Sequence, residues 1–413
     1  SEDLAVDLVA GREYNSNSQL SGIEGVLGGG GDDWIQGDAE GNWLDGGAGD
    51  DTLLGGAGND TLLAGAGSDS LDGGAGWNAA SYATFDGRVE VNLEAGQARG
   101  YDAEGEEIKS DLLANIQAVV GGAGDDTLTA AAAGSWLDGA GGNNHLIGGI
   151  GNDTLASSGL GQDTLDGGAG FDTADYRNAS EDLAVDLVAG REYNSNSQLS
   201  GIEGVLGGGG DDWIQGDAEG NWLDGGAGDD TLLGGAGNDT LLAGAGSDSL
   251  DGGAGWNAAS YATFDGRVEV NLEAGQARGY DAEGEEIKSD LLANIQAVVG
   301  GAGDDWIQGD ANANWLYGGE GDDTLDGAGG GDTLFGGDGA DHFIYSAGDG
   351  FTVIGDYVAG TDKFELHGLT TYTTYLAGTG TDTVVDFGNG DRLYLVGIRP
   401  EDLSQHITDF HFI

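Results

Sequence analysis

The chain has 413 residues, a length that would ordinarily suggest two to four globular domains. Its composition is unusual, since 87 Gly, 74 Asp plus Glu and only 12 Lys plus Arg give a formal net charge of −62. A surface of this sign argues against nucleic acid and anionic membranes as partners. The chain has no Cys, which excludes disulfides and thiolate metal sites. So many carboxylates need multivalent cations, and Ca²⁺ suits carboxylate and carbonyl oxygens.

An unchanged duplication organises the sequence, because residues 1–126 recur as residues 180–305. Ser1 corresponds to Ser180, which lies within a module, and the chain contains no Met. We therefore expect more protein upstream of Ser1, as in a fragment or a processed product. No apolar run approaches the roughly 18 residues of a membrane-spanning helix, so we expect no membrane insertion.

Within the duplication, a nine-residue motif of the form Gly-Gly-x-Gly-x-Asp-x-apolar-x recurs in phase, beginning at residues 28–36. It fills four blocks that are separated by spacers of a second kind. In chain order we expect a partial spacer 1–27, block one 28–81, a spacer 82–120, block two 121–175, a spacer 176–206, block three 207–260, a spacer 261–299, block four 300–345, and a C-terminal cap 346–413 that is also the expected secretion signal.

The spacers are predicted to form strands. In the spacer 82–120, Val89 and Val91 alternate with polar residues, which is the period-two pattern of a half-buried strand. A helical turn at residues 110–114 is a weaker alternative. The tail lacks the nonapeptide and favours short strands, with a hairpin that joins 383–387 to 392–396. Pro400 marks the first turn of a short helix.

Each nonapeptide combines a turn with a short strand. Its glycines permit left-handed backbone and bring carbonyl oxygens together, while one Asp supplies charge. The apolar residue at position eight, such as Ile35, points inward, and positions seven and nine face water. Two nonapeptides complete one turn of a flattened coil, so loops 18 residues apart stack on one edge and can share a Ca²⁺. Without the ion, each edge would hold carboxylates about 4.8 Å apart, so we expect folding to depend on Ca²⁺.

The sequence therefore predicts an all-β fold. We expect a right-handed parallel β-roll or β-helix solenoid in four blocks, with β-strand spacers and a small β-rich C-terminal cap. The blocks resemble the RTX (repeats in toxin) family, whose nonapeptides form parallel β-rolls with several Ca²⁺ ions in the turns. The metal ligands that this resemblance implies, all at position six, are Asp33, Asp51, Asp60, Asp69, Asp126, Asp153, Asp163, Asp172, Asp212, Asp230, Asp239, Asp248, Asp305, Asp323, Asp332 and Asp341.

Some repeats depart from the family pattern at position six. Asn42, Ser135, Asn144 and Asn314 replace the Asp, as does Asn78 at a block end, so we expect weaker or vacant sites there. The tail also resembles the segment that follows RTX blocks in proteins exported by type I secretion, and residues 409–413 are similar to its aromatic end. The resemblance implies an extracellular or cell-surface protein that folds on Ca²⁺ after export.

Two interpretations of the tryptophans remain open. They lie at position seven of the first or second nonapeptide after a spacer, where outward aromatic rings could bind sugar or form a junction core under the spacer. Their confinement to block starts favours the junction core. The residues are Trp34, Trp43, Trp136, Trp213, Trp222, Trp306 and Trp315.

Motifs of other chemistries are missing from the sequence. No His pair has the HExxH spacing, no GK[ST] follows a glycine-rich loop, and there is no GxSxG. Carboxylate pairs such as Asp50 and Asp51 recur at every turn, whereas a catalytic pair needs one asymmetric environment. We therefore expect no zinc site, no nucleotide site and no enzyme activity.

The duplication adds length without adding a new site, which favours a structural, adhesive or assembly role, as in a surface-layer, filament or adhesin segment. Calcium ions are the expected partners, and self-assembly or a cell-surface polysaccharide are the candidates beyond them. The alternative is the non-catalytic C-terminal region of a secreted lipase, protease, polysaccharide epimerase or toxin whose active domain lies upstream.

Overall fold

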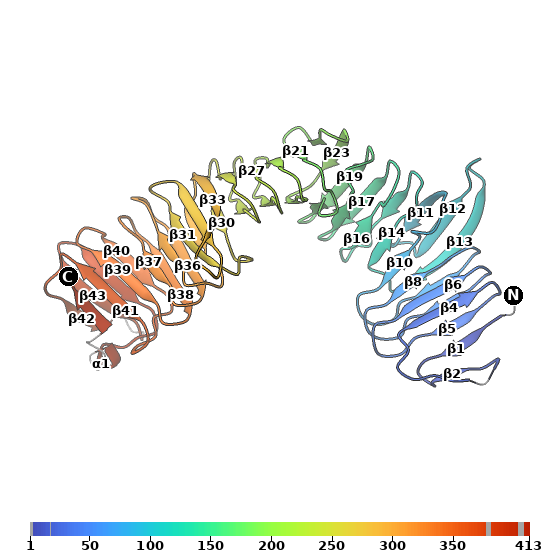
Figure 1. Cartoon of the computed structure of the whole chain (residues 1–413), viewed down its shortest axis with the longest axis horizontal. Helices are drawn as coiled ribbons and strands as arrows, with labels where there is room; N and C mark the ends of the chain where they lie inside the picture. Colours follow the sequence, from blue (N-terminus) through green and yellow to red (C-terminus); the bar gives the residue numbers. More distant parts are fainter. Residues whose placement is uncertain (1–2, 17, 377–380, 404–408) are drawn as a thin grey trace. The chain divides into compact units, whose positions relative to one another are not determined.

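The computed structural model describes residues 3–16, 18–376, 381–403 and 409–413. It divides into two compact units, Ser1–Leu206 and Gly207–Ile413, each a stack of short strands (Figure 1). Among the described residues the α-helix is α1, Pro400–Leu403, which begins where the sequence predicted a helical turn. No helix in the described part of the chain is long and apolar enough to cross a membrane.

Each nonapeptide contributes one short strand, and successive strands alternate between two sheets. In the first sheet, β5 (Trp34–Gln36) pairs in parallel with β7 (Thr52–Leu54). In the second sheet, β6 (Trp43–Gly47) pairs in parallel with β8 (Thr61–Leu63). Paired residues lie 18 positions apart, as in Trp34 opposite Thr52, so two nonapeptides make one coil. The predicted parallel β-roll is confirmed.

The core consists of the stacked position-eight side chains between the two sheets. Ile35, Leu44, Leu53 and Leu62 are completely buried, and burial of such a side chain stabilises the fold by about 1.5–3 kcal/mol. Positions seven and nine are mostly half-buried and not fully exposed, because the neighbouring coil is about 4.8 Å away and covers part of each side chain.

The unit Ser1–Leu206 contains the remaining strands of blocks one and two and of their spacers. In the first sheet these are β1 (Ala5–Asp7), β2 (Arg12–Glu13), β3 (Ser18–Gln19), β9 (Ser70–Asp72), β11 (Arg88–Asn92), β12 (Gln97–Tyr101), β13 (Glu107–Ala114), β15 (Thr127–Thr129), β17 (His145–Ile150), β19 (Thr164–Ala169), β21 (Ala184–Asp186), β22 (Arg191–Glu192) and β23 (Ser197–Ser200). In the second sheet they are β4 (Gly25–Gly29), β10 (Ala79–Ser81), β14 (Ala118–Val120), β16 (Trp136–Asp138), β18 (Thr154–Ala156), β20 (Thr173–Asp175) and β24 (Gly204–Leu206).

The unit Gly207–Ile413 repeats this arrangement and adds the C-terminal strands. Its first sheet contains β25 (Trp213–Gln215), β27 (Thr231–Leu233), β29 (Ser249–Asp251), β31 (Arg267–Asn271), β32 (Gln276–Tyr280), β33 (Glu286–Ala293), β35 (Trp306–Gln308), β37 (Thr324–Asp326), β39 (His342–Ser346), β41 (Lys363–His367) and β45 (Phe410–Phe412). Its second sheet contains β26 (Trp222–Asp224), β28 (Thr240–Leu242), β30 (Ala258–Ser260), β34 (Ala297–Val299), β36 (Trp315–Glu320), β38 (Thr333–Asp338), β40 (Phe351–Ile354), β42 (Thr373–Leu376), β43 (Thr383–Gly388) and β44 (Asp391–Leu395).

The spacers 82–120 and 261–299 each insert a three-stranded antiparallel meander into the first sheet. In the first meander, β13 pairs in parallel with β9, β12 lies between β13 and β11, and β11 pairs in parallel with β15. Val89 and Val91 are buried, as their alternation predicts. The helical turn considered for residues 110–114 is wrong, because β13 spans them. Lys109, Asp111 and Leu113 alternate inward along this strand.

The C-terminal strands continue the roll and close it with aromatic side chains. β41 pairs with β39 and β45 pairs with β41, both in parallel. The rings of Phe343 and Phe364 lie 5.5 Å apart between centroids, and those of Phe364 and Phe410 lie 4.8 Å apart. The expected hairpin is present as β43 and β44. Residues 377–380 and 404–408 of the predicted cap lie outside the described residues.

Candidate metal sites

The position-six aspartates form ladders that tie together loops on the same edge. The backbone N–H of Asp33 donates to Oδ1 of Asp51 at 2.7 Å, and the backbone N–H of Asp51 donates to Oδ1 of Asp69 at 2.8 Å. Block three has the same ladder from Asp212 through Asp230. One carboxylate oxygen of each Asp is therefore used to stack the coils, and the other is left to face its own loop.

All sixteen predicted ligands are buried. In nine of them the second oxygen, Oδ2, is buried without a hydrogen-bond partner among the described residues. A buried carboxylate oxygen without a donor costs free energy, so these atoms are suited to binding a cation. They belong to Asp33, Asp51, Asp60, Asp153, Asp172, Asp230, Asp239, Asp323 and Asp332.

The glycine at position one keeps the space beside each Oδ2 open. A Cβ on Gly28 would strike both Asp33 Oδ2 and the carbonyl oxygen of Gly46 in the next loop of the same edge. A Cβ on Gly318 would strike Asp323 Oδ2 in the same way. The space is lined by carboxylate and carbonyl oxygens, which are the donors that Ca²⁺ prefers. The residues present therefore fit calcium, with the carbonyls supplying most of the ligands.

Side chains alone would not make these sites. In the described part of the chain, no group of three or more His, Asp or Glu side chains is placed to hold one metal ion. One Asp per loop, together with backbone carbonyls, fits a hard cation such as Ca²⁺ better than zinc, which is held by three or four Cys, His or carboxylate side chains.

Burial raises the pKa of several carboxyls in these ladders. The pKa of Asp51 rises to about 6 because the group is removed from water, and the charges of Asp69 and Asp33 add to this, whereas the hydrogen bond from the Asp33 N–H opposes it. For the same first reason the pKa of Asp323 rises to about 8 and that of Asp230 to about 7. A divalent cation beside Oδ2 would favour the charged form of each group.

Six of the seven remaining predicted ligands have a partner for Oδ2, so the sites fall into two classes. Asp126, Asp212 and Asp305, in the first loop after a spacer, accept from the N–H of the position-two glycine of their own loop. Asp163 Oδ2 accepts from the hydroxyl of Ser157 at 2.6 Å. Asp69 and Asp248 contact buried lysines. Asp341 continues the ladder from Asp323.

The departures at position six also take part in the ladders. The backbone N–H groups of Asn42 and Asn314 donate to Oδ1 of Asp60 and Asp332, one coil further along. Their own Oδ1 atoms accept from Asp38 and Asp310 within the same loop. Ser135 accepts from Ala131, and Asn144 accepts from Asp126. These side chains supply no second carboxylate oxygen, which is consistent with the expected weaker sites, as at Asn78, whose Oδ1 accepts from Asp60.

Sequence reasoning missed the ladder members that the spacers and the tail supply. The N–H of Asp69 donates to Asp111 Oδ1 at 2.8 Å, the N–H of Asp248 donates to Asp290 Oδ1 at 2.9 Å, and the N–H of Asp341 donates to Asp362 Oδ1 at 3.1 Å. A signal was present, because each is followed two residues later by a buried apolar residue, as in the second half of the nonapeptide. It was hidden because the glycines of the first half are replaced before Asp111 and Asp290, and before Asp362 only Gly360 remains.

The tryptophans lie beside the spacers and not beneath them. Trp34 is paired with Ala5, Trp43 with Gly25 and Trp136 with Ala118, so a small spacer residue neighbours each indole in the same sheet. Trp34 and Trp136 are half-buried, and Trp43 is 39% exposed. These three rings therefore contact the spacers from the side, on the outer faces of the two sheets, and no core under the spacer encloses them.

Comparison with known proteins agrees with this arrangement. The family model of the RTX calcium-binding nonapeptide repeat (4 copies) matches over just more than half of the chain, at residues 27–62, 54–79, 120–155, 157–174, 206–241, 233–258, 299–334 and 320–351. No curated protein matches the chain. The crystal structure of the extracellular lipase LipA from Serratia marcescens aligns at 21% identity and a TM-score of 0.20, over 55% of this chain and 42% of the lipase chain. That likeness is too low to support any inference, and this chain spans less than half of the lipase. The repeats and their match to the family model establish that the chain belongs to the RTX family of calcium-binding nonapeptide-repeat proteins.

Proposed function

We propose that this chain is a non-catalytic, calcium-stiffened segment of an extracellular protein with a structural, adhesive or assembly role. The observation that carries the proposal is the repetition of each candidate site. Asp51 and Asp230 occupy equivalent places in the duplication, each in a ladder that ends at a spacer. A catalytic acid and base need environments that differ from each other, and identical loops do not supply them.

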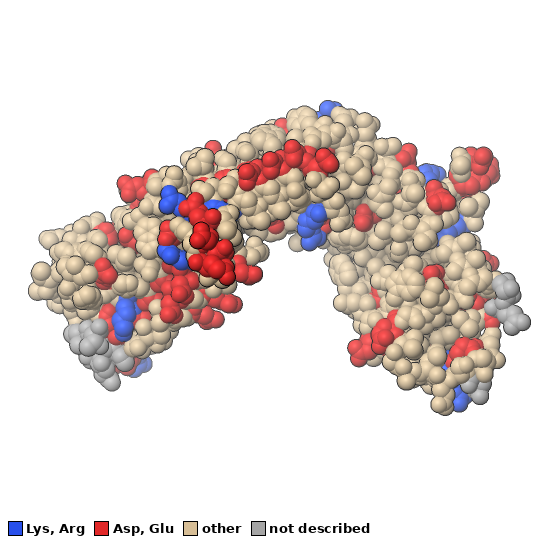
Figure 2. Space-filling model, in the orientation of Figure 1, with Lys and Arg blue, Asp and Glu red and all other residues tan. Residues whose placement is uncertain are grey.

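The surface charge sets a condition on any assembly. Figure 2 shows acidic side chains gathered in groups on the visible face and few basic ones, in keeping with 74 acidic and 12 basic residues. Two copies of such a surface repel each other unless cations lie between them. We therefore propose that self-association, if it is the role of the segment, requires Ca²⁺. Analytical ultracentrifugation in millimolar Ca²⁺ and in chelator tests this. A chain that is monomeric in both conditions, and binds a polysaccharide, favours the second partner class.

We also propose that residues 346–413 contain the signal for export by a type I system. The resemblance of the final residues to the end of such proteins supports this, and Phe412 and Ile413 are exposed. Expression with a type I exporter, with and without residues 346–413, is the test. Export of the truncated chain would contradict the proposal.

The intact mass of the native secreted product tests the non-catalytic role. We expect a product built of repeats, spacers and cap. A catalytic domain upstream of Ser1 would instead favour the alternative, in which this segment is the C-terminal region of a secreted enzyme or toxin.

A further inference from the structure

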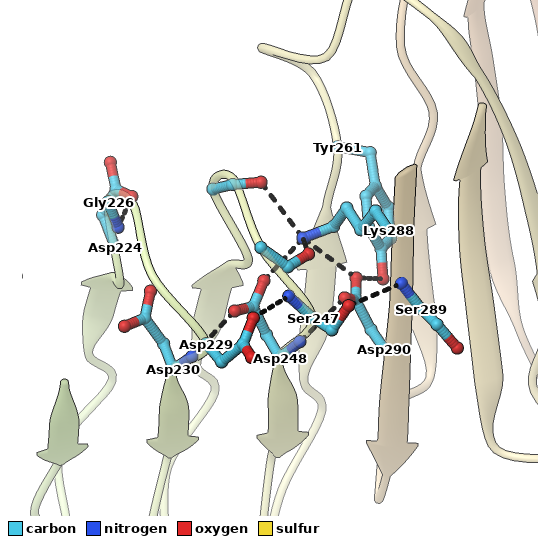
Figure 3. Close-up of polar contacts among 12 residues, drawn as sticks. Asp224, Gly226, Asp229, Asp230, Ser247, Asp248, Tyr261, Lys288, Ser289 and Asp290 are labelled. Carbon is cyan, nitrogen blue, oxygen red and sulfur yellow. Dashed lines mark hydrogen bonds and ion pairs between the residues drawn. The ribbon is translucent and has the colours of Figure 1, made fainter. Parts of the chain in front are cut away.

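Two buried lysines lie inside the loop columns of the roll. The side chain of Lys288 is 2% exposed, and its Nζ donates to the carbonyl oxygens of Gly244 at 3.0 Å and Gly246 at 3.4 Å (Figure 3). The same Nζ lies 2.5 Å from Asp248 Oδ2 and 3.2 Å from Asp290 Oδ2. The ammonium thus contacts two loop carbonyl oxygens and one carboxylate oxygen from each of Asp248 and Asp290, which are successive aspartates of one ladder.

The duplicate copy has the same arrangement. Lys109 Nζ donates to the carbonyl oxygen of Gly67 at 3.1 Å, and it lies 2.5 Å from Asp69 Oδ2 and 3.0 Å from Asp111 Oδ1. Its side chain is also 2% exposed. The hydroxyl of Tyr82 donates to Asp111 Oδ2 at 3.0 Å, so a second buried side chain fixes the carboxylate that faces the lysine.

The sequence explains how lysine reaches this position. Asp290 takes the place of the position-six aspartate after Asp248, since the N–H of Asp248 donates to its Oδ1. Lys288 is two residues earlier and therefore stands where the nonapeptide has its position-four glycine, as at Gly246. From this position on β33 the lysine side chain reaches the carboxylates of Asp248 and Asp290.

The contrast with the preceding loops identifies what the ammonium replaces. In Asp51 and Asp230, Oδ2 is buried without a partner among the described residues, in loops whose oxygens fit calcium. One coil further along the same ladders, Oδ2 of Asp69 and of Asp248 instead faces a lysine ammonium. We propose that Lys109 and Lys288 are internal cations that occupy the last calcium position of their ladders, so that each ladder ends on a charge of the chain itself and binds one ion fewer than its aspartates allow.

The proposal rests on the proposed calcium binding by the loops. It implies that, in each of these two ladders, Ca²⁺ binds only in the loops that precede the lysine contact. It also distinguishes the spacers. In the spacer 176–206 the ladder ends on Ser197, whose hydroxyl oxygen accepts from the N–H of Asp163 at 2.9 Å. The spacers 82–120 and 261–299 are instead joined to their blocks by a lysine ammonium, which needs no Ca²⁺.

The test replaces each lysine by the glycine that the nonapeptide has at position four. In the full chain, Lys109→Gly combined with Lys288→Gly should bind two more Ca²⁺ per chain than the unaltered protein, as counted by mass spectrometry of the metal after equilibration in CaCl₂. The matched control is Arg99→Gln combined with Arg278→Gln. It removes two cations from the same meanders at half-exposed positions 3.8 Å from Glu107 and Glu286. We expect no change in the ion count of the control.

A second pair of variants covers the case in which the glycine variant is unstable. Lys109→Met with Lys288→Met removes the charges but fills the space, so raising CaCl₂ from 1 to 10 mM should stabilise the glycine variant more than the methionine variant against urea. Equal ion counts in the glycine variant and the unaltered chain, an equal calcium response of both variants, or a glycine variant that stays unfolded at every Ca²⁺ concentration would each overturn the proposal. An unaltered chain that binds no Ca²⁺ would instead overturn the calcium function itself.

Discussion

Oδ1 of Asp51 accepts a hydrogen bond from the backbone N–H of Asp33 at 2.7 Å, one coil away, while Oδ2 of the same carboxylate is buried without a partner among the described residues. The two oxygens thus have separate roles. Oδ1 links neighbouring coils, and the amide oxygen of an Asn can accept the same hydrogen bond, as Asn78 does from Asp60. Oδ2 lies toward the loop carbonyls and carries the charge that attracts a cation.

This separation allows a variant that removes the charge and keeps the stacking. Asp51→Asn should weaken calcium binding by about tenfold or more, because ligand charge sets affinity, while the amide oxygen still accepts from Asp33. Asp50→Asn is the control, since exposed Asp50 loses the same charge and its oxygen accepts from Ser68 in a parallel exposed ladder. Calcium titration followed by calorimetry measures both. Equal effects would mean that position six is not the ligand.

Folding of the whole chain should depend on Ca²⁺. Neutralising the buried carboxylates is a condition for stacking the loops. Circular dichroism in chelator at pH 8.5 should therefore show a largely unstructured chain, and millimolar Ca²⁺ at the same pH should restore the β spectrum. We expect midpoints of about 10⁻⁴ to 10⁻³ M, or tighter with cooperative binding. A β spectrum that survives chelation and dialysis would refute this dependence.

The raised carboxyl pKa values give the calcium-free protein an unusual pH dependence. Folding raises the pKa of Asp51 to about 6 and that of Asp323 to about 8, above the usual value of about 3.9 in an unfolded chain. The folded state therefore binds more protons than the unfolded state between about pH 4 and 8, and its stability is lost as the pH rises through this window. Calcium-depleted protein should thus keep more β structure at pH 5 than at pH 8.5.

Calcium binding should change in the opposite direction, because protons compete with the ion for the same carboxylates, so affinity should fall from pH 8 to pH 5. Asp323→Asn should reduce the pH dependence of the calcium-free fold near pH 8. Asp322→Asn removes an exposed charge next to it and should not. A β content of the calcium-free chain that increases with pH, measured by circular dichroism, would contradict the assignment.

The nonapeptide pattern was sufficient to predict the roll and its core, because position eight has a fixed place in every coil. The sixteen ligands that the family resemblance implies at position six stay a prediction. The meander could not be predicted from that pattern. Its strand β13 returns to pair with β9 after a long excursion, and only this return places Lys109 against Asp69. Period-two alternation identified Val89 and Val91, but it does not specify which strand a segment joins.

The aromatic stack at the C-terminal end should stabilise the last coils without affecting distant ones. Phe364 is buried between Phe343 and Phe410, so Phe364→Ala should cost about 3–5 kcal/mol. In a solenoid each coil contacts only its neighbours, so the loss should remain local. Hydrogen exchange of the calcium-loaded chain should show lost protection in β39, β41 and β45 and unchanged protection in β5 and β7. Phe351→Ala, at a residue that is 45% exposed, is the control and should cost less than about 1 kcal/mol. Loss of protection spread evenly over the chain would show that the cap and the first block unfold as one cooperative unit, contrary to this prediction.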